Sequence, residues 1–147
     1  MRRVFLLLWA MGAILVVVGG IAWAASLLGT QAGNTLTGTN ESDTIVGAQG
    51  GDVIHLLGGN DFGYGDSQND QINGGDGNDR IWLDSGSADR GNGNAGDDYI
   101  ISVDGSGGDT IDGGEGGETE GDWCVGDSGD TFVPDTCEDE DPTNPNL

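Results

Sequence analysis

The chain has 147 residues, of which 30 are glycine, and its 26 acidic residues face only four arginines, which gives a formal net charge of −22 at pH 7. A surface this acidic repels phosphate, so the composition excludes nucleic acid as a partner. The single histidine, His55, lies far from the two cysteines, which excludes a zinc or copper site with nitrogen and sulfur ligands in tetrahedral spacing.

Residues 1–25 are a hydrophobic leader in which two arginines precede an apolar run. The Ala-Trp-Ala sequence at residues 22–24 has the small-x-small pattern of a signal-peptidase site, which favours a cleaved signal peptide. The run is also long enough to cross a bilayer as a helix, so a signal anchor is the alternative. Both interpretations place the remaining chain outside the cytoplasm, because the arginines hold the N-terminus inside. We therefore expect an extracellular protein, either secreted or attached to the cell surface.

A nine-residue repeat follows the leader. Aspartates at positions 43, 52, 61, 70 and 79 are each nine residues apart, and the spacing loosens through Asp89, Asp98, Asp109 and Glu118. Glycine-rich stretches precede them, as in GGDGNDRIW at residues 74–82, which indicates tight turns followed by short strands. An apolar residue two positions after the aspartate is expected to face inward, at Ile45, Ile54, Ile72, Ile81, Ile100 and Ile111. Gly63 and Gly91 interrupt this series and are expected to weaken the core.

The unit GGDGNDRIW resembles the RTX, or hemolysin-type, calcium-binding repeat G-G-x-G-x-D-x-U-x at every fixed position. The resemblance extends over residues 29–133, and Asn34, Gln68 and Glu118 depart from the pattern. It implies an all-β fold, a right-handed parallel β-roll (β-solenoid), in which two nonapeptides form one coil and the turns stack in two columns. An acidic, glycine-rich linker with accidental spacing is the alternative.

Stacked turns of this kind predict several bound Ca²⁺ ions. Aspartates one coil apart lie about 4.8 Å apart, where bare carboxylates repel each other. A hard cation with six to eight oxygen ligands would satisfy them, and flexible turns rich in carbonyl groups favour calcium over magnesium. Because Arg80 and Arg90 alone oppose the 26 acids outside the leader, we expect a chain that is disordered until calcium binds. The metal ligands implied by the resemblance are Asp43, Asp52, Asp61, Asp70, Asp79, Asp89, Asp98, Asp109, Gly50, Gly59, Gly75, Gly77, Gly96 and Gly107.

Two cysteines follow the regular repeats. In an exported chain Cys124 and Cys137 predict a disulfide, which would close a C-terminal cap over residues 124–137. Two free thiols are the alternative. Residues 138–147 are acidic and interrupted by prolines, which predicts a disordered tail.

No recognisable catalytic motif accompanies the repeats. No motif places a serine or cysteine nucleophile near His55, and the regular array of carboxylates is already explained by metal binding. The sequence therefore predicts an exported calcium-binding β-roll that folds on binding calcium and has no catalytic activity of its own. A surface-anchored adhesive or structural module that calcium rigidifies is the alternative, and anchoring in the membrane through an uncleaved leader would favour it.

Overall fold

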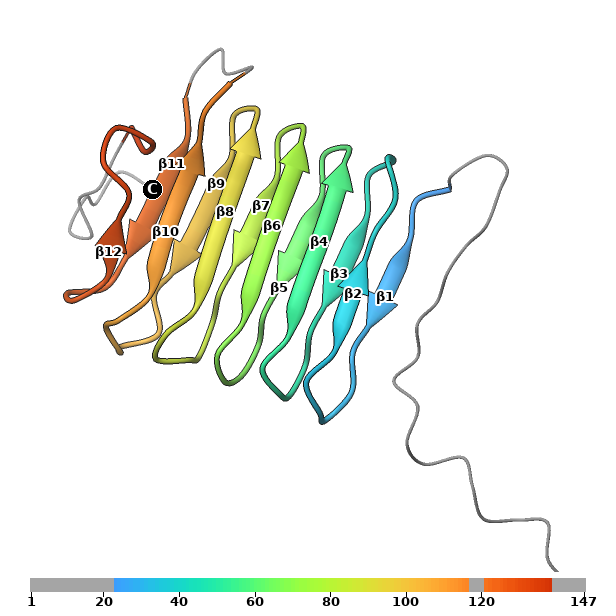
Figure 1. Ribbon diagram of the computed structural model, residues 1–147, viewed down its shortest axis with the longest axis horizontal. Coiled ribbons are helices and arrows are strands. Elements are labelled where there is room, and N and C mark those ends of the chain that lie inside the picture. Colours follow the sequence, from blue (N-terminus) through green and yellow to red (C-terminus); the bar gives the residue numbers. More distant parts are fainter. Residues whose placement is uncertain (1–22, 117–120, 139–147) are drawn as a thin grey trace, which may run out of the picture.

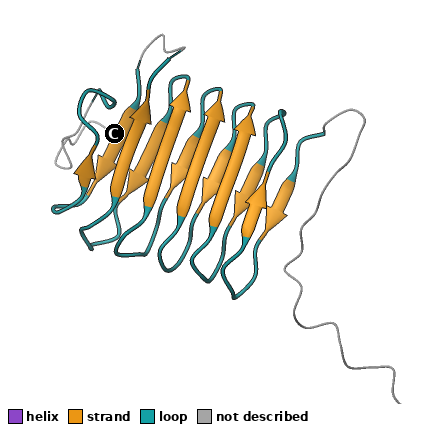
Figure 2. Ribbon diagram, viewed as in Figure 1, coloured by secondary structure: helices purple, strands orange, loops and turns teal. Residues whose placement is uncertain are grey.

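A computed structural model describes residues 23–116 and 121–138, and over these residues the chain is all-β (Figures 1 and 2). Consecutive strands alternate between two parallel sheets, so that each pair of strands completes one coil. The predicted parallel β-solenoid is confirmed, and the interpretation as an acidic linker is wrong. Within the described ranges there is no helix that could cross a membrane. Residues 1–22 of the predicted leader and residues 139–147 of the predicted tail lie outside the described residues.

The odd-numbered strands form one sheet, here called sheet A, and the even-numbered strands form sheet B. Sheet A contains β1 (Ser26–Leu28), β3 (Thr44–Val46), β5 (Phe62–Tyr64), β7 (Arg80–Trp82), β9 (Tyr99–Ser102) and β11 (Trp123–Gly126). Sheet B contains β2 (Thr35–Thr37), β4 (Val53–Gly58), β6 (Gln71–Asp76), β8 (Arg90–Ala95), β10 (Thr110–Gly114) and β12 (Thr131–Phe132).

The core lies between the two sheets and contains the predicted isoleucines. These six side chains, at most 1 % exposed, are Ile45, Ile54, Ile72, Ile81, Ile100 and Ile111. Register keeps them stacked, since Ile54 pairs with Ile72 and Ile81 pairs with Ile100. The period of two along each strand therefore turns these isoleucines toward the inside of the solenoid.

Two leucines fill the gaps that Gly63 and Gly91 would leave, so the expectation of a weakened core is wrong. A Cβ on Gly63 would lie 3.2 Å from Leu56 Cδ1, and a Cβ on Gly91 would lie 3.3 Å from both Cδ atoms of Leu83. Both leucines are fully buried. Each stands at position 1 of a repeat that has glycine at position 8. In these two repeats the inward apolar side chain therefore comes from position 1 instead of position 8. The core is continuous past both glycines.

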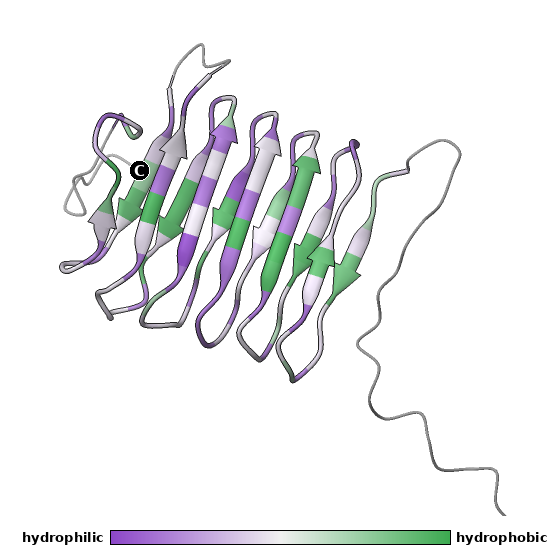
Figure 3. Ribbon diagram, in the orientation of Figure 1, coloured by the Kyte–Doolittle hydropathy of each residue, from purple (hydrophilic) through white to green (hydrophobic). Residues whose placement is uncertain are grey.

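The outer faces of the two sheets differ in chemistry. On sheet A the rings of Tyr64 and Trp82 stack with their centroids 4.8 Å apart, and Phe62 stacks on Trp82 at 6.1 Å. The Arg80 guanidinium lies 5.4 Å from the Phe62 ring centroid. The outer face of sheet B is mainly polar, and Figure 3 shows the hydrophilic β8 of this sheet together with the more apolar β4. One broad face of the solenoid is thus aromatic and the other carries amides and hydroxyl groups.

A disulfide closes the C-terminal end. Cys124 and Cys137 are bonded with an S–S distance of 2.03 Å, as predicted, and Cys124 is buried against the core. Strand β12 pairs with β10 through Ile111 and Phe132. The last coil is therefore held both by the sheet and by a covalent bond.

Candidate metal-binding turns

Every aspartate predicted as a ligand ends a turn and lies at most 2 % exposed. The turns stack along the two long edges of the solenoid (Figure 1). Column 1 leads into sheet A and carries Asp43, Asp61, Asp79 and Asp98, and column 2 leads into sheet B and carries Asp52, Asp70, Asp89 and Asp109. The two predicted columns are therefore present, with their carboxylates turned inward.

One oxygen of each carboxylate is bonded to the preceding coil. The Asp61 amide donates to Asp79 Oδ1 at 2.9 Å, and the Asp79 amide donates to Asp98 Oδ1 at 2.7 Å. Column 2 has the same bond, for example from the Asp52 amide to Asp70 Oδ1 at 2.7 Å. These bonds join successive coils and satisfy Oδ1. Each carboxylate therefore has one oxygen with a hydrogen-bond partner, which the sequence did not show.

The other oxygen, Oδ2, is buried without a hydrogen-bond partner in the six central turns of the described chain. These turns end in Asp52, Asp61, Asp70, Asp79, Asp89 and Asp98. Burying a charged oxygen without a partner is costly, and a bound cation or a proton removes that cost. Each of the six atoms is therefore a candidate metal ligand.

Backbone carbonyl oxygens accompany the free Oδ2 atoms. A Cβ on Gly47 would lie 2.6 Å from Asp52 Oδ2 and 2.8 Å from the carbonyl oxygen of Gly65 in the next coil. Both oxygens thus lie within 3 Å of one point, which only a residue without a side chain leaves open. The same arrangement pairs Asp70 with Leu83 O at Gly65, Asp79 with Gly93 O at Gly74, and Asp98 with Gly113 O at Gly93.

These carbonyl groups belong to position 1 of the next repeat in the column, a set that the sequence prediction missed. The nine-residue period could have predicted these carbonyl groups, because position 1 of each repeat lies beside the turn of the preceding coil in the same column. At Asp61 and Asp89, position 1 is Leu56 and Leu83. These two turns keep a free Oδ2 but lack the glycine.

The glycines predicted as ligands shape the turns. Five of them have φ between 109° and 129°, a region that favours glycine: Gly50, Gly59, Gly75, Gly77 and Gly96. Gln68 adopts φ 78° at the position where the repeat has glycine, so its turn keeps the same path. Gly107 differs from the others, because the positive φ values of its turn fall on Gly105 and Gly108.

The predicted carboxylates at the two ends are satisfied within the protein. Thr39 donates from its amide to Asp43 Oδ2 and from its hydroxyl to Asp43 Oδ1. Ser102 Oγ donates to Asp109 Oδ2 at 2.5 Å, and the Asp89 amide donates to Asp109 Oδ1 at 2.8 Å. Asn34, which replaces an aspartate, accepts the Thr30 amide at 2.6 Å. The ends therefore lack the free buried oxygen of the central turns.

Both columns continue beyond the predicted aspartates. The Asp98 amide donates to Asp122 Oδ1 at 2.7 Å, and the Asp109 amide donates to Asp130 Oδ1 at 3.1 Å. Glu118, which the spacing placed next, lies outside the described residues. Cys124 and Phe132 each follow one of these aspartates by two positions, so the aspartate-x-apolar pattern could have found both.

Burial raises the pKa of the central aspartates, because water no longer solvates the charged form. The pKa rises to about 7 for Asp70, Asp79 and Asp98 and to about 6 for Asp61 and Asp89, and that of Asp52 is also raised. The amide bonds to the preceding coil oppose this rise. Neighbouring carboxylates, such as Asp61 beside Asp79, add to it. Protons and cations therefore compete for the same oxygens near neutral pH.

The donor set fits a hard cation. Each central turn offers a carboxylate oxygen, and several also place a backbone carbonyl oxygen beside it. Calcium prefers such ligands, whereas zinc clusters use nitrogen and sulfur. Across the part of the chain that the structure describes, no three His, Cys, Asp or Glu side chains gather as a metal cluster. His55 lies on the outer face of β4, with Nδ1 3.5 Å from Asn73 Nδ2.

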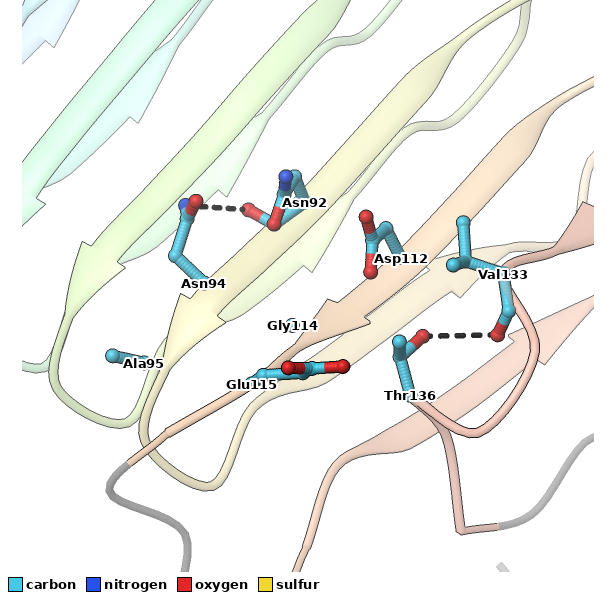
Figure 4. Close-up of a pocket in the computed structure, with 8 residues that line it drawn as sticks. All are labelled: Asn92, Asn94, Ala95, Asp112, Gly114, Glu115, Val133 and Thr136. Atoms are coloured by element: carbon cyan, nitrogen blue, oxygen red, sulfur yellow. Dashed lines mark hydrogen bonds between the residues drawn. The ribbon is translucent and has the colours of Figure 1, made fainter.

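A shallow hollow on the outer face of sheet B is separate from these turns (Figure 4). Its lining residues include Asn92, Asn94, Asp112, Glu115, Val133 and Thr136. Asn94 Nδ2 donates to the Asn92 carbonyl at 3.4 Å, and the Thr136 hydroxyl donates to the Val133 carbonyl at 3.0 Å. None of the six buried carboxylates lines it, so the hollow is not part of the candidate metal site.

The fold and the turns together define a parallel β-solenoid with buried carboxylates that are candidate cation ligands. A family model of the RTX calcium-binding nonapeptide repeat, in four copies, matches residues 28–63 and 57–88. Residues 28–88 therefore match the RTX repeat, whose family is a calcium-binding structural module. No curated protein and no solved structure matches the chain. The structure extends the same coil geometry through β12.

Proposed function

We propose that this chain is an exported calcium-binding β-roll that folds when calcium fills its central turns and that has no catalytic activity of its own. One observation carries the proposal: six carboxylate oxygens are buried without a partner, in register along two columns. A protein this acidic gains most from a ligand that is positively charged and bound by oxygen.

The arrangement of these oxygens supports a coupling between binding and folding. A free Oδ2 and its neighbouring carbonyl oxygen come from different coils, as with Asp79 and Gly93. The two atoms meet only when the coils are stacked. Bound calcium would be the positively charged partner that the Oδ2 atoms lack. Binding free energy then becomes folding free energy.

Two features support export. The leader has the pattern of a signal peptide, and Cys124 and Cys137 form a disulfide, which persists in oxidising compartments. Calcium sites of extracellular modules bind in the range of about 10⁻⁴–10⁻³ M. We expect the midpoint of calcium-induced folding in that range.

Circular dichroism of the chain without its leader tests the proposal. We expect a cooperative gain of β-structure on adding calcium and a much smaller gain with magnesium at the same concentration. An Asp76→Asn variant is the control for the effect of charge. The substitution removes one negative charge from an exposed side chain and leaves the buried carboxylates unchanged. Equal β-content in chelator and in calcium would refute folding on binding.

The outer face of sheet A favours a second candidate, a surface-anchored adhesive or structural module. Its partly buried apolar side chains include Val46, Tyr64, Trp82, Ile101 and Val125, which pair in register across five strands. A calcium-rigidified scaffold would present this row to a partner. The mass of the exported protein decides between the candidates. A mass that includes the leader supports anchoring, and the mass of a chain that begins near residue 25 supports secretion.

A further inference from the structure

We propose that the Ser102 hydroxyl closes the Asp109 turn in place of an ion, so that this turn of column 2 does not bind calcium. This inference rests on the proposed calcium binding of the central turns. It contradicts the expectation from sequence that Asp109 is a ligand like the other aspartates.

Ser102 stands where the central turns have no donor. It follows Ile101, which pairs with Trp82, so Ser102 occupies the place that Leu83 holds one coil earlier. The carbonyl oxygen of Leu83 in turn lies beside Gly65. Neither leucine nor glycine carries a side-chain donor, and Asp70 and Asp89 keep a free Oδ2. The serine hydroxyl is the single change in this series that can donate to the carboxylate.

The bond between Ser102 and Asp109 is fully buried. Both residues are 0 % exposed, and Ser102 Oγ lies 2.5 Å from Asp109 Oδ2. A hydroxyl that donates to an ionised carboxylate forms a short, charge-assisted hydrogen bond. The Asp89 amide donates to the other oxygen, Asp109 Oδ1, at 2.8 Å. Both oxygens of Asp109 therefore accept hydrogen bonds from the protein, and neither is left without a partner.

The second carboxylate of this turn is satisfied in the same way. Asp104 Oδ2 accepts the Gly86 amide at 3.1 Å, and Asp104 Oδ1 accepts the Ser106 amide at 2.6 Å. The turn thus contains two carboxylates whose four oxygens all accept hydrogen bonds from the protein. The central turns differ, since each has a buried Oδ2 without such a bond.

Counting bound calcium ions by native mass spectrometry tests the inference. Asp109→Asn keeps a side-chain oxygen for the Asp89 amide and offers an NH₂ group to Ser102 Oγ, so this variant is expected to fold. We expect it to bind as many ions as the wild type. Asp89→Asn, the matched change one coil earlier, is expected to bind at least one ion fewer.

Ser102→Ala provides the converse test, because it frees Asp109 Oδ2. We expect this variant to bind one ion more than the wild type, whereas Ser106→Ala in the same turn leaves the number unchanged. The inference is overturned if Asp109→Asn loses an ion or if Ser102→Ala gains none. A wild-type chain that binds no calcium would instead refute the proposed function, so the two failures are distinguishable.

Discussion

The central turns and the turns of Asp43 and Asp109 carry an aspartate at the same place in the repeat but differ in how they hold it. In the centre, as at Asp79, one carboxylate oxygen is bonded to the neighbouring coil and the other is buried and free. At the ends, Thr39 and Ser102 donate to the second oxygen of Asp43 and Asp109. The same residue at the same position of the repeat is thus a candidate ligand in one turn and a structural acceptor in another.

This difference shows that one neighbouring donor decides what a repeated carboxylate does. A repeat gives every turn its aspartate, but a nearby donor, the Thr39 amide at Asp43 and the Ser102 hydroxyl at Asp109, occupies the oxygen that stays free in the central turns. The Asp43 and Asp109 turns flank the turns with a free Oδ2, and the Asp130 turn follows that of Asp109. We therefore expect substitutions in the centre and at the ends to have unequal effects.

The largest effect is expected for Gly74→Ala. The added Cβ would overlap with Asp79 Oδ2 and with the carbonyl oxygen of Gly93, so it both displaces two candidate ligands and overpacks the turn. Overpacking alone costs about 1–3 kcal/mol. We expect the calcium midpoint, measured by circular dichroism, to rise by about a hundredfold or more.

Gly58→Ala is the control for this variant. Gly58 is also buried, but a Cβ there would meet its nearest atoms at 3.7 Å, which is ordinary van der Waals contact. Its midpoint is expected to stay within about twofold of the wild type, a difference of about 0.4 kcal/mol. Equal shifts for both variants would show that position 1 has no special role.

A smaller effect is expected for Asp79→Asn, which keeps the shape of the side chain and removes its charge. The calcium midpoint should rise about tenfold, equivalent to about 1.4 kcal/mol, because the free oxygen loses its attraction for a cation. Asp109→Asn should shift the midpoint much less, since both Asp109 oxygens are already bonded and the amide NH₂ can donate to Ser102 Oγ. Indistinguishable shifts in calcium titrations of the two variants would erase the distinction between centre and end.

The smallest effect is expected from pH in the absence of calcium. Burial raises the pKa of Asp70, Asp79 and Asp98 to about 7 from an unfolded value of 3.8. Protonation therefore stabilises the folded state: the contribution is complete below about pH 4 and is lost as the pH rises through about 7. In chelator, β-content measured by circular dichroism should be higher at about pH 5 than at about pH 8.

An Asp79→Asn/Asp98→Asn double variant sharpens this experiment. It removes two of the titrating groups, so its gain of β-content on acidification should be smaller than that of the wild type. An identical gain in both proteins would assign the effect to overall charge instead of the buried carboxylates.

The period of the sequence predicted the fold well because it is a local rule repeated in every coil. Glycine-rich turns, an aspartate and an inward apolar residue recur together, so the buried isoleucines followed from spacing, and the two columns of turns followed from the resemblance to the RTX repeat. The pairing of Cys124 with Cys137 followed from there being only two cysteines.

The sequence was less informative where a contact joins positions that the repeat does not link. Leu56 fills the space beside Gly63, but the gap looked empty because position 1 was assigned only to the turn. Insertions hid Asp122 behind Glu118 and separated Ser102 from Asp109 by seven residues. The bonding of each Oδ1 to the preceding coil depends on backbone geometry that spacing does not specify.

The measurement that tests the central claim most directly is a crystal structure grown in calcium, with ions located from anomalous scattering. We expect calcium within about 2.3–2.6 Å of the Oδ2 atoms of the six central aspartates, including Asp79, with the carbonyl oxygen of Gly93 in the same coordination shell. Central turns that fold without an ion beside these oxygens would contradict the account.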